Sequence, residues 1–545
     1  MPPVEAPGPA VLSKPLTVTV VGIILIVLVR RLHWSLKLRE LERLHGCKRV
    51  RHENGGSQYD FIGIAKAIEL AFHFRRRTSL PYTNALFKEY GETYASNVLG
   101  YRLIFTCSAE NIKHLLSTAF ADFDSSPLRK PLFEPITPHG IFTLDGAGWK
   151  KSRDQLRSRL SNLRKIVDLN QCERHFQAFL QHIPPYGQAF DAQACAFALA
   201  LDMQTFFSLG ESIDALSFSQ AREKKQFVED LLFVKETIVQ DGFRGPLRYF
   251  YPKRRFLQCC KRARKYVIAH VARQLKEHGS MSEKKGDSPR HDCSTDDEQV
   301  SVWADQGLSI LLANDSMSTT LSGLFFCLSQ DERVVHKLRA SILDTVGLEP
   351  PIWGQLGSLH YVRWVLQEGE EYCNNISHEH TANILTLEVM RLFPAVVFNA
   401  RVANKDSTLP TGGGTDGNSP VLIQKDEIVV FSTWARHRLG NDFGKNPEEF
   451  YPERWEHLNG EMIGFIPFNK GPRACPGRKT SPPGIVMVYL FTYLGAEHYA
   501  MIVLTYIVAR IFQTFSTVTN YNTHDWTERI SMTLENENGV FIGLS

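Results

Sequence analysis

A cysteine near the C-terminus lies in a short segment suited to presenting its sulfur. Residues 468–477 read FNKGPRACPG, so Gly471 and Gly477 bracket Cys475, and Pro476 follows it directly. Glycine and proline at these positions predict a tight loop and not a helix interior. Backbone N–H groups in such a loop can point at a thiolate, lower its pKa and tune a bound iron. The segment therefore predicts a metal-ligating thiolate, whereas each of the other nine cysteines is better explained as a small buried hydrophobe.

Two further groups of polar residues have spacings that could carry chemistry or architecture. Glu388 and Arg391 are three residues apart, which places both side chains on one helix face and allows an ion pair. A buried ion pair is costly unless every charge is paired, so we expect an architectural role for it. Asp315 and Ser316 interrupt a mostly apolar helix predicted over residues 301–328. One explanation of this pair is that it only hydrogen-bonds to the preceding turn.

The composition limits the class of protein in which these residues must work. The chain has 545 residues, of which 43% are hydrophobic and 22% are charged, with a formal net charge of +4. These values exclude collagen-like, wholly disordered and polytopic membrane proteins, and they imply no general nucleic-acid-binding field. The ten cysteines include no C-x-x-C pair, which argues against a disulfide framework or a zinc ribbon.

The periodicity of the chain predicts a mainly α protein with minor β. Helical spacing of apolar residues dominates residues 61–275. Residues 402–431 contain glycine turns between β-branched runs, which predicts a small sheet, and residues 530–542 are strand-like. Helical patterns resume after the polar segment at residues 276–299 without a new fold type, so we expect one large domain over residues 61–545.

The cysteine loop and four other segments together resemble the cytochrome P-450 family. Residues 468–477 agree with its F-x-x-G-x-R-x-C-x-G pattern at every specified position. In the order that the family requires, the chain also has WKKSR at residues 149–153, LANDSM at residues 312–317, EVMRLFP at residues 388–394 and FYPERW at residues 450–455. Phrases such as FNARVA at residues 398–403 resemble the fungal branch that hydroxylates alkanes and fatty acids at or near the chain terminus. This similarity runs from about residue 41 to the C-terminus.

The resemblance implies a role for each matching residue. Cys475 would be the axial thiolate ligand of the iron in haem b, where it favours O–O cleavage. The other cofactor-binding residues that it implies are Phe468, Gly471, Arg473, Gly477, Trp149 and Arg153. A structural salt-bridge network holding the cysteine loop would comprise Glu388 (or Glu368), Arg391 and Arg454. Asp315 and Ser316 would deliver protons, although Ser replaces the usual Thr of the family and lacks the methyl that restricts its rotamer.

The implied activity is that of a haem-thiolate monooxygenase with the mainly α cytochrome P-450 fold. Its co-substrate would be O2, and its electrons would come from NADPH through a flavin reductase. Lys470, Arg473, Arg478 and Lys479 make the cysteine loop basic, which suits an acidic reductase face. The implied substrate is a long-chain alkane or fatty acid, hydroxylated at or near its terminus. A monooxygenase of aromatic or terpenoid substrates is the alternative within the class.

The N-terminal residues predict a membrane anchor. Residues 1–15 form a tail, residues 16–31 are the anchor, and residues 32–60 are a basic and polar linker. Residues 16–29 carry no charge, and Arg30 and Arg31 follow them, which predicts a single-pass anchor in the endoplasmic reticulum with a cytosolic catalytic domain. The alternatives are a membrane-associated helix that does not span, a cleaved signal peptide and a buried core helix.

Two segments have no counterpart in the family pattern. Residues 369–388 separate a WVLQE helix from the arginine of E-x-x-R, and without them Glu368 would supply the acid of that motif. Residues 478–496 follow the cysteine loop, where the family enters a helix at once, and their Pro-Pro-Gly would break any such helix. Our hypothesis is that both are translated introns, with genuine insertion loops as the alternative. A catalytically impaired or haem-poor protein is the corresponding rival to an active enzyme.

Overall fold

The computed structural model describes residues 46–53, 62–159, 167–284, 297–359, 384–456, 464–475 and 496–545, with residue 458 and separate positions between 22 and 44. The predicted anchor at 16–31, Glu368, Gly477 and most of both suspect segments lie outside these continuous ranges. Of the helices in the described parts of the chain, none combines the length and the hydropathy needed to cross a membrane.

Helices make up most of the described structure, as the sequence predicts. They are α2 (Ile64–Arg76), α3 (Ser79–Tyr90), α4 (Ala109–Lys113), α5 (Ser126–Phe133), α6 (Gly146–Arg159), α8 (Leu169–Leu180), α9 (Ala192–Leu209), α10 (Arg222–Arg244), α11 (Arg254–Lys284), α12 (Asp297–Leu312), α13 (Asp315–Leu328), α14 (Glu332–Val346), α15 (Trp353–Ser358), α16 (Ile384–Leu392), α17 (Thr433–Leu439) and α18 (Ala496–Thr514).

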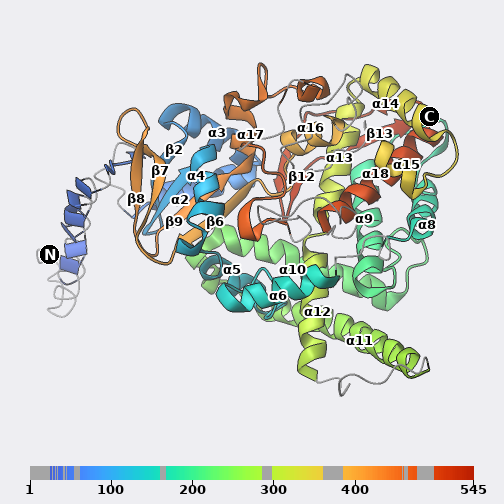
Figure 1. Cartoon of the computed structure of the whole chain (residues 1–545), viewed down its shortest axis with the longest axis horizontal. Coiled ribbons are helices and arrows are strands. Elements are labelled where there is room, and N and C mark those ends of the chain that lie inside the picture. The colour runs from blue at the N-terminus through green and yellow to red at the C-terminus, as the bar shows by residue number, and fades with distance from the viewer. Residues whose placement is uncertain are drawn as a thin grey trace, which may run out of the picture.

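The strands form one larger mixed sheet and three small ones. They are β1 (Arg51–His52), β2 (Thr93–Val98), β3 (Tyr101–Thr106), β4 (Phe123–Asp124), β5 (Phe190–Asp191), β6 (Phe398–Ala403), β7 (Ser407–Gly413), β8 (Ser419–Ile423), β9 (Ile428–Ser432), β10 (Val518–Asn520), β11 (Glu528–Ile530), β12 (Leu534–Asn536) and β13 (Phe541–Leu544). The larger sheet has the order β1-β2-β3-β9-β6-β4, with β3 and β9 parallel. It lies at the N-terminal side of the molecule, and most helices lie on the other side (Figure 1).

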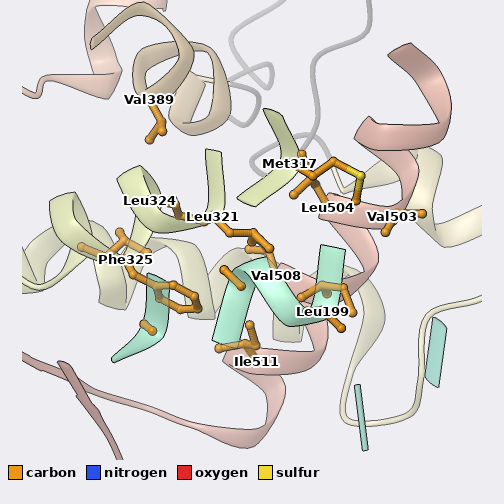
Figure 2. Close-up of a cluster of buried hydrophobic side chains, with 14 of the residues drawn as sticks. Leu199, Met317, Leu321, Leu324, Phe325, Val389, Val503, Leu504, Val508 and Ile511 are labelled. Atoms are coloured by element: carbon orange, nitrogen blue, oxygen red, sulfur yellow. The ribbon is translucent and has the colours of Figure 1, made fainter. Parts of the chain in front are cut away.

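The main hydrophobic core surrounds α13. Its side chains pack with those of α9, α16 and α18, as Figure 2 shows for Leu321, Leu199, Val389 and Val508. Gly323 permits a close contact in this core, because a Cβ at this position would lie 2.9 Å from the ring of Phe393. A rigid α13 therefore connects the candidate proton-transfer residues at its N-terminus to α16, which carries the E-x-x-R motif.

The long helix predicted over residues 301–328 is two helices in the structure. α12 ends at Leu312, and α13 begins at Asp315. The amide of Ala313 still donates to the carbonyl of Ile310 at 3.0 Å, and the amide of Met317 donates to that of Asn314 at 3.2 Å. Both bonds span three residues instead of four, and Ser316 Oγ also donates to the carbonyl of Ala313, so the polar run takes backbone groups out of the regular helical pattern.

Candidate functional site

The cysteine loop has the tight geometry that its glycines and prolines predict. A short turn covers Gly471–Arg473, the amide of Ala474 donates to the carbonyl of Gly471 at 3.0 Å, and the amide of Cys475 donates to that of Phe468 at 3.0 Å. Gly471 has φ +69°, and a Cβ there would overlap the Leu116 carbonyl. The loop therefore depends on glycine at this position, and it leaves Cys475 half-buried.

Arg473 of this loop lies near three other arginines, and we call Arg129, Arg153, Arg401 and Arg473 the arginine cluster. Arg401 on β6 is 1% exposed, and its Nη1 donates to Asn399 Oδ1 at 3.0 Å. Arg129 Nη2 donates to the same oxygen at 3.0 Å. The guanidinium of Arg473 lies over the Trp149 ring at 4.5 Å, and that of Arg153 lies over the same ring at 5.6 Å. α5, α6, β6 and the cysteine loop thus bring positive charge to one place.

Burial and mutual repulsion act on the arginine cluster, and carboxylates among the described residues oppose them, with Asp145 and Asp124 both acting on Arg473. Burial, followed by the charges of Arg129 and Arg473, lowers the pKa of Arg401 to about 9, with Asp145 opposing the shift. Burial, then the charge of Arg473, lowers the pKa of Arg129 to about 10. Asp145 pairs with Arg473 and also accepts the amide of Ser125. A guanidinium stays protonated in proteins, so these shifts reflect first the burial of the cations and then the repulsion between them.

The buried positive charge of this cluster bears on whether the residues present fit the haem that the resemblance implies. The Nε of Arg401 is buried and has no hydrogen-bond partner among the described residues. A buried donor without a partner is costly, and planar guanidinium groups bind carboxylates well. Haem brings two propionate carboxylates, and Cys475 lies beside the same arginines. Burial and the charge of Arg157 lower the pKa of Arg153 to about 10, and the charge of Cys475 opposes that shift. The residues present therefore fit the group.

Glu388, Arg391 and Arg454 form one buried cluster. Glu388 and Arg391 are both 0% exposed, and Arg391 donates to the carboxylate twice at 2.8 Å. Arg454 Nε donates to Glu388 Oε1 at 2.9 Å, and Trp455 Nε1 donates to Oε2 at 2.9 Å. Backbone carbonyls accept the remaining guanidinium donors, including that of Phe443 from Arg454 at 2.7 Å. The cluster fixes α16 against the segment that leads to the cysteine loop.

The structure gives Asp315 and Ser316 separate partners. Ser316 Oγ donates to the carbonyl of Ala313 at 3.2 Å, which is the local hydrogen bond named as the alternative role. Asp315, which is 2% exposed, accepts from Lys235 Nζ at 2.7 Å. Burial raises the pKa of Asp315, and the charge and hydrogen bond of Lys235 oppose that shift. Lys235 also donates to Asn314 Oδ1 at 2.6 Å, so α10 is fastened to the break between α12 and α13.

Sequence reasoning missed the roles of Lys235 and Arg129, and it missed that Arg401 is buried within the arginine cluster. A signal existed for Lys235, because it lies on the same helical face of α10 as Leu231 and Ile238, which are buried. Arg401 is buried on β6, and the two residues that follow it, Val402 and Ala403, are buried and apolar. A charged residue at a buried position of either pattern indicates a partner elsewhere in the chain.

Comparisons with known proteins agree with this arrangement. The sequence model of the family "Cytochrome P450" matches residues 67–369 and 383–481, and the gap between them falls within the first suspect segment. The chain is 30% identical over 540 residues to "Cytochrome P450 monooxygenase himC" of Aspergillus japonicus, covering 96% of this chain and 88% of that protein. It is 29% identical over 477 residues to "Cytochrome P450 52A13" of Debaryomyces hansenii, with 83% of each covered. It is 33% identical over 401 residues to "Cytochrome P450 52A8" of Candida tropicalis, covering 70% of this chain and 74% of that protein. The family predicted from the sequence is confirmed, and the chain belongs to the cytochrome P450 family of monooxygenases.

Proposed function

We propose that this monooxygenase hydroxylates a long-chain alkane or fatty acid at or near its terminus. The observation that carries the chemistry is the half-buried Cys475 beside the arginine cluster, in which the buried Nε of Arg401 has no hydrogen-bond partner among the described residues. Apolar side chains from three separate segments support a lipophilic substrate, because Phe142, Leu312 and Met532 belong to one hydrophobic cluster next to the break before Asp315. The resemblance of phrases such as FNARVA at residues 398–403 to the fungal alkane- and fatty-acid-hydroxylating branch supports the chain-terminal position.

The residues of this chain have distinct tasks in the proposed reaction. When haem is bound, it supplies oxygen activation and the one-electron chemistry of C–H hydroxylation. Cys475 would hold the iron through its thiolate, and the arginine cluster would bind the propionates. Asp315 would hold a proton at its carboxylate and pass it toward Ser316, whose hydroxyl both donates and accepts. NADPH would act through a flavin reductase docked on the basic cysteine loop.

Product analysis tests the substrate. We expect the purified chain, with reductase, NADPH and O2, to convert long-chain fatty acids or alkanes into chain-terminal or near-terminal alcohols. A matched panel of aromatic and terpenoid compounds is the comparison. Turnover restricted to that panel would contradict the proposed substrate and would favour the aromatic or terpenoid alternative.

We also propose that the enzyme works at the endoplasmic reticulum membrane, with its catalytic domain in the cytosol. The support is an exposed apolar surface on α2, at the C-terminal end of α10 and on the connection from α10 to α11, comprising Ile64, Ile68, Phe72, Phe243, Tyr249 and Phe250. The stacked rings of Phe74 and Phe243, 4.0 Å apart, join α2 and α10. Arg76 and Arg248 lie over aromatic rings of this surface at 4.5 and 4.7 Å. Apolar side chains interspersed with arginine suit an anionic lipid interface.

Hydrogen exchange on the full chain tests this surface. Vesicles of phosphatidylcholine and phosphatidylserine are expected to protect peptides that cover residues 243–257. Phe218 is the matched control, because it is 79% exposed and Phe250 is 84% exposed, yet Phe218 lies outside this surface. Protection of both peptides, or of neither, would contradict the proposal.

Replacing Lys235 with methionine is expected to destabilise the protein in a pH-dependent way. The substitution leaves the Asp315 carboxylate buried without its cation, at a cost of about 3–5 kcal/mol when the group is ionised. The pKa of Asp315 is already raised by burial, and removing Lys235 raises it further, so the variant loses stability relative to the parent as pH rises. Thermal unfolding at pH 5 and pH 8 measures this. The double variant Lys235→Met, Asp315→Asn should remove most of the difference, and a loss that is equal at both pH values would contradict the account.

We propose that residues 369–388 and 478–496 are retained introns. The gap in the family match at residues 370–382 supports this for the first segment. Sequencing of spliced transcripts across Glu368 and Gly477 tests it, because messages that retain both segments would exclude the proposal. Genuine insertion loops are the alternative. In that case the absorption spectrum of the full chain, which carries both segments, shows whether haem still binds.

A further inference from the structure

One buried histidine lies between the E-x-x-R helix and the cysteine loop. His437, on α17, is 0% exposed. Its Nδ1 lies 3.2 Å from the carbonyl oxygen of Arg391, and its Nε2 accepts a hydrogen bond from the amide of Ile466 at 3.1 Å. Arg391 Nη1 donates in return to the carbonyl of His437 at 3.0 Å. The ring is therefore bonded on both nitrogens to backbone groups of two different segments.

The partners of the ring determine its tautomer. A carbonyl oxygen can only accept, so Nδ1 must carry the proton, and an amide N–H can only donate, so Nε2 must be unprotonated. Burial lowers the pKa of His437 well below its usual range, and the positive charges of Arg391, Arg438 and Arg436 lower it further. A protonated ring would also place two N–H groups against each other at Ile466. His437 is thus a neutral imidazole with one donor and one acceptor, both in use.

The two segments that His437 joins are those that must be aligned for the thiolate to be placed. Arg391 belongs to the buried cluster with Glu388. On the other side, the carbonyl of Ile466 accepts from the amide of Asn469 at 3.2 Å, which opens the turn leading to Cys475. The rings of Phe443 and Phe465, with centroids 5.8 and 5.2 Å from that of His437, restrict its rotation. A displacement of the imidazole would therefore move the start of the cysteine loop.

We propose that His437 is a positioning residue that holds the start of the cysteine loop in register with α16, through one hydrogen bond to Arg391 and one from Ile466. The proposal rests on the proposed function, because the loop is taken to place a haem-ligating thiolate. His437 itself touches neither the thiolate nor the substrate in this account. It acts through Ile466 on the turn that ends at Cys475.

Three variants of the full chain test this role. His437→Phe keeps a planar ring but loses both hydrogen bonds. His437→Gln keeps one donor and one acceptor on a flexible side chain, and it should partly restore the parent behaviour. His175→Phe is the control, since His175 is also buried and its Nε2 has no hydrogen-bond partner in the described parts of the chain.

Hydrogen exchange of the peptide covering residues 464–475 is the first measurement. We expect exchange at Ile466 to rise on the order of tenfold in His437→Phe, to rise less in His437→Gln, and to stay unchanged in His175→Phe. The reduced, carbon-monoxide-bound spectrum is the second measurement, and the fraction with a thiolate-type band should fall in the same order. If His437→Phe does not accumulate as folded protein, His437→Gln is compared with the parent alone. Faster exchange at Ile466 in His437→Gln then supports the positioning role, and unchanged exchange contradicts it.

The two proposals fail in different ways. A parent chain that shows no thiolate-type band contradicts the proposed function, whatever the exchange data are. A parent chain with that band, together with unchanged exchange and an unchanged spectrum in both His437 variants, would overturn the positioning role.

Discussion

Cys475→Ser is expected to abolish the thiolate-type spectrum and to reduce hydroxylation by roughly a thousandfold or more, which corresponds to about 4 kcal/mol in the reaction barrier. The physical reason is the loss of the thiolate, because an alcohol at this position is neutral near pH 7 and does not push electron density toward iron. The loop itself should survive, since its amide and carbonyl bonds do not involve the sulfur. Absorption of the reduced, carbon-monoxide-bound protein and product formation measure the two effects.

Cys195→Ser is the matched control for this substitution. Cys195 on α9 has the same intermediate exposure as Cys475. Burial, and then the charge of Asp191, raises the pKa of the Cys195 thiol to about 11, so it carries no thiolate at neutral pH. The control should keep the spectrum and the activity of the parent. A Cys475→Ser protein with a thiolate-type band would show that another residue ligates the iron.

Glu388→Gln is expected to destabilise the fold by about 3–5 kcal/mol, the usual cost of removing one partner of a buried ion pair. The carboxylate accepts from Arg391, Arg454 and Trp455, and from the amide of Tyr451 at 3.0 Å. A neutral amide of the same shape leaves two buried guanidinium groups without their counterion. The two N–H groups of that amide would also point at N–H groups that now donate to the carboxylate. Thermal unfolding measures the loss, and the capacity to bind haem should fall with it.

Glu332→Gln provides the comparison on the surface. Glu332 is 83% exposed and pairs with His336 four residues away. Exposed pairs of this kind contribute less than about 1 kcal/mol, so its loss should be small. Equal effects of the two substitutions would contradict the view that the buried cluster supports the cysteine loop. If the first segment is an intron, a chain without residues 369–388 should still fold, with Glu368 in the place of Glu388. Glu368→Gln in that chain should then destabilise the fold as Glu388→Gln does in the full chain.

The features that the sequence predicts well are local ones. The glycines and prolines around Cys475 prescribe a tight loop, and the i, i+3 spacing of Glu388 and Arg391 prescribes a shared helix face. Both predictions require only the residues within one turn. The single helix predicted over residues 301–328 was wrong in one respect, because the polar run at Asn314 and Asp315 separates α12 from α13.

The features that sequence reasoning missed depend on distant segments. Lys235 reaches Asp315 across 80 positions of sequence, and Arg129 meets Arg401 through the side chain of Asn399. The hydrogen bonds of His437 likewise connect α16, α17 and the segment before the cysteine loop. A single sequence shows that such residues are polar within apolar patterns, but the packing of the fold determines which of them meet.

The absorption spectrum of the full chain, reconstituted with haem, reduced and exposed to carbon monoxide, tests the central claim most directly. A half-buried Cys475 beside the arginine cluster predicts a thiolate-type Soret band that Cys195→Ser retains and Cys475→Ser loses. Folded protein that binds no haem, or that binds it without this band, would contradict a haem-thiolate monooxygenase and would favour a haem-poor product of retained introns.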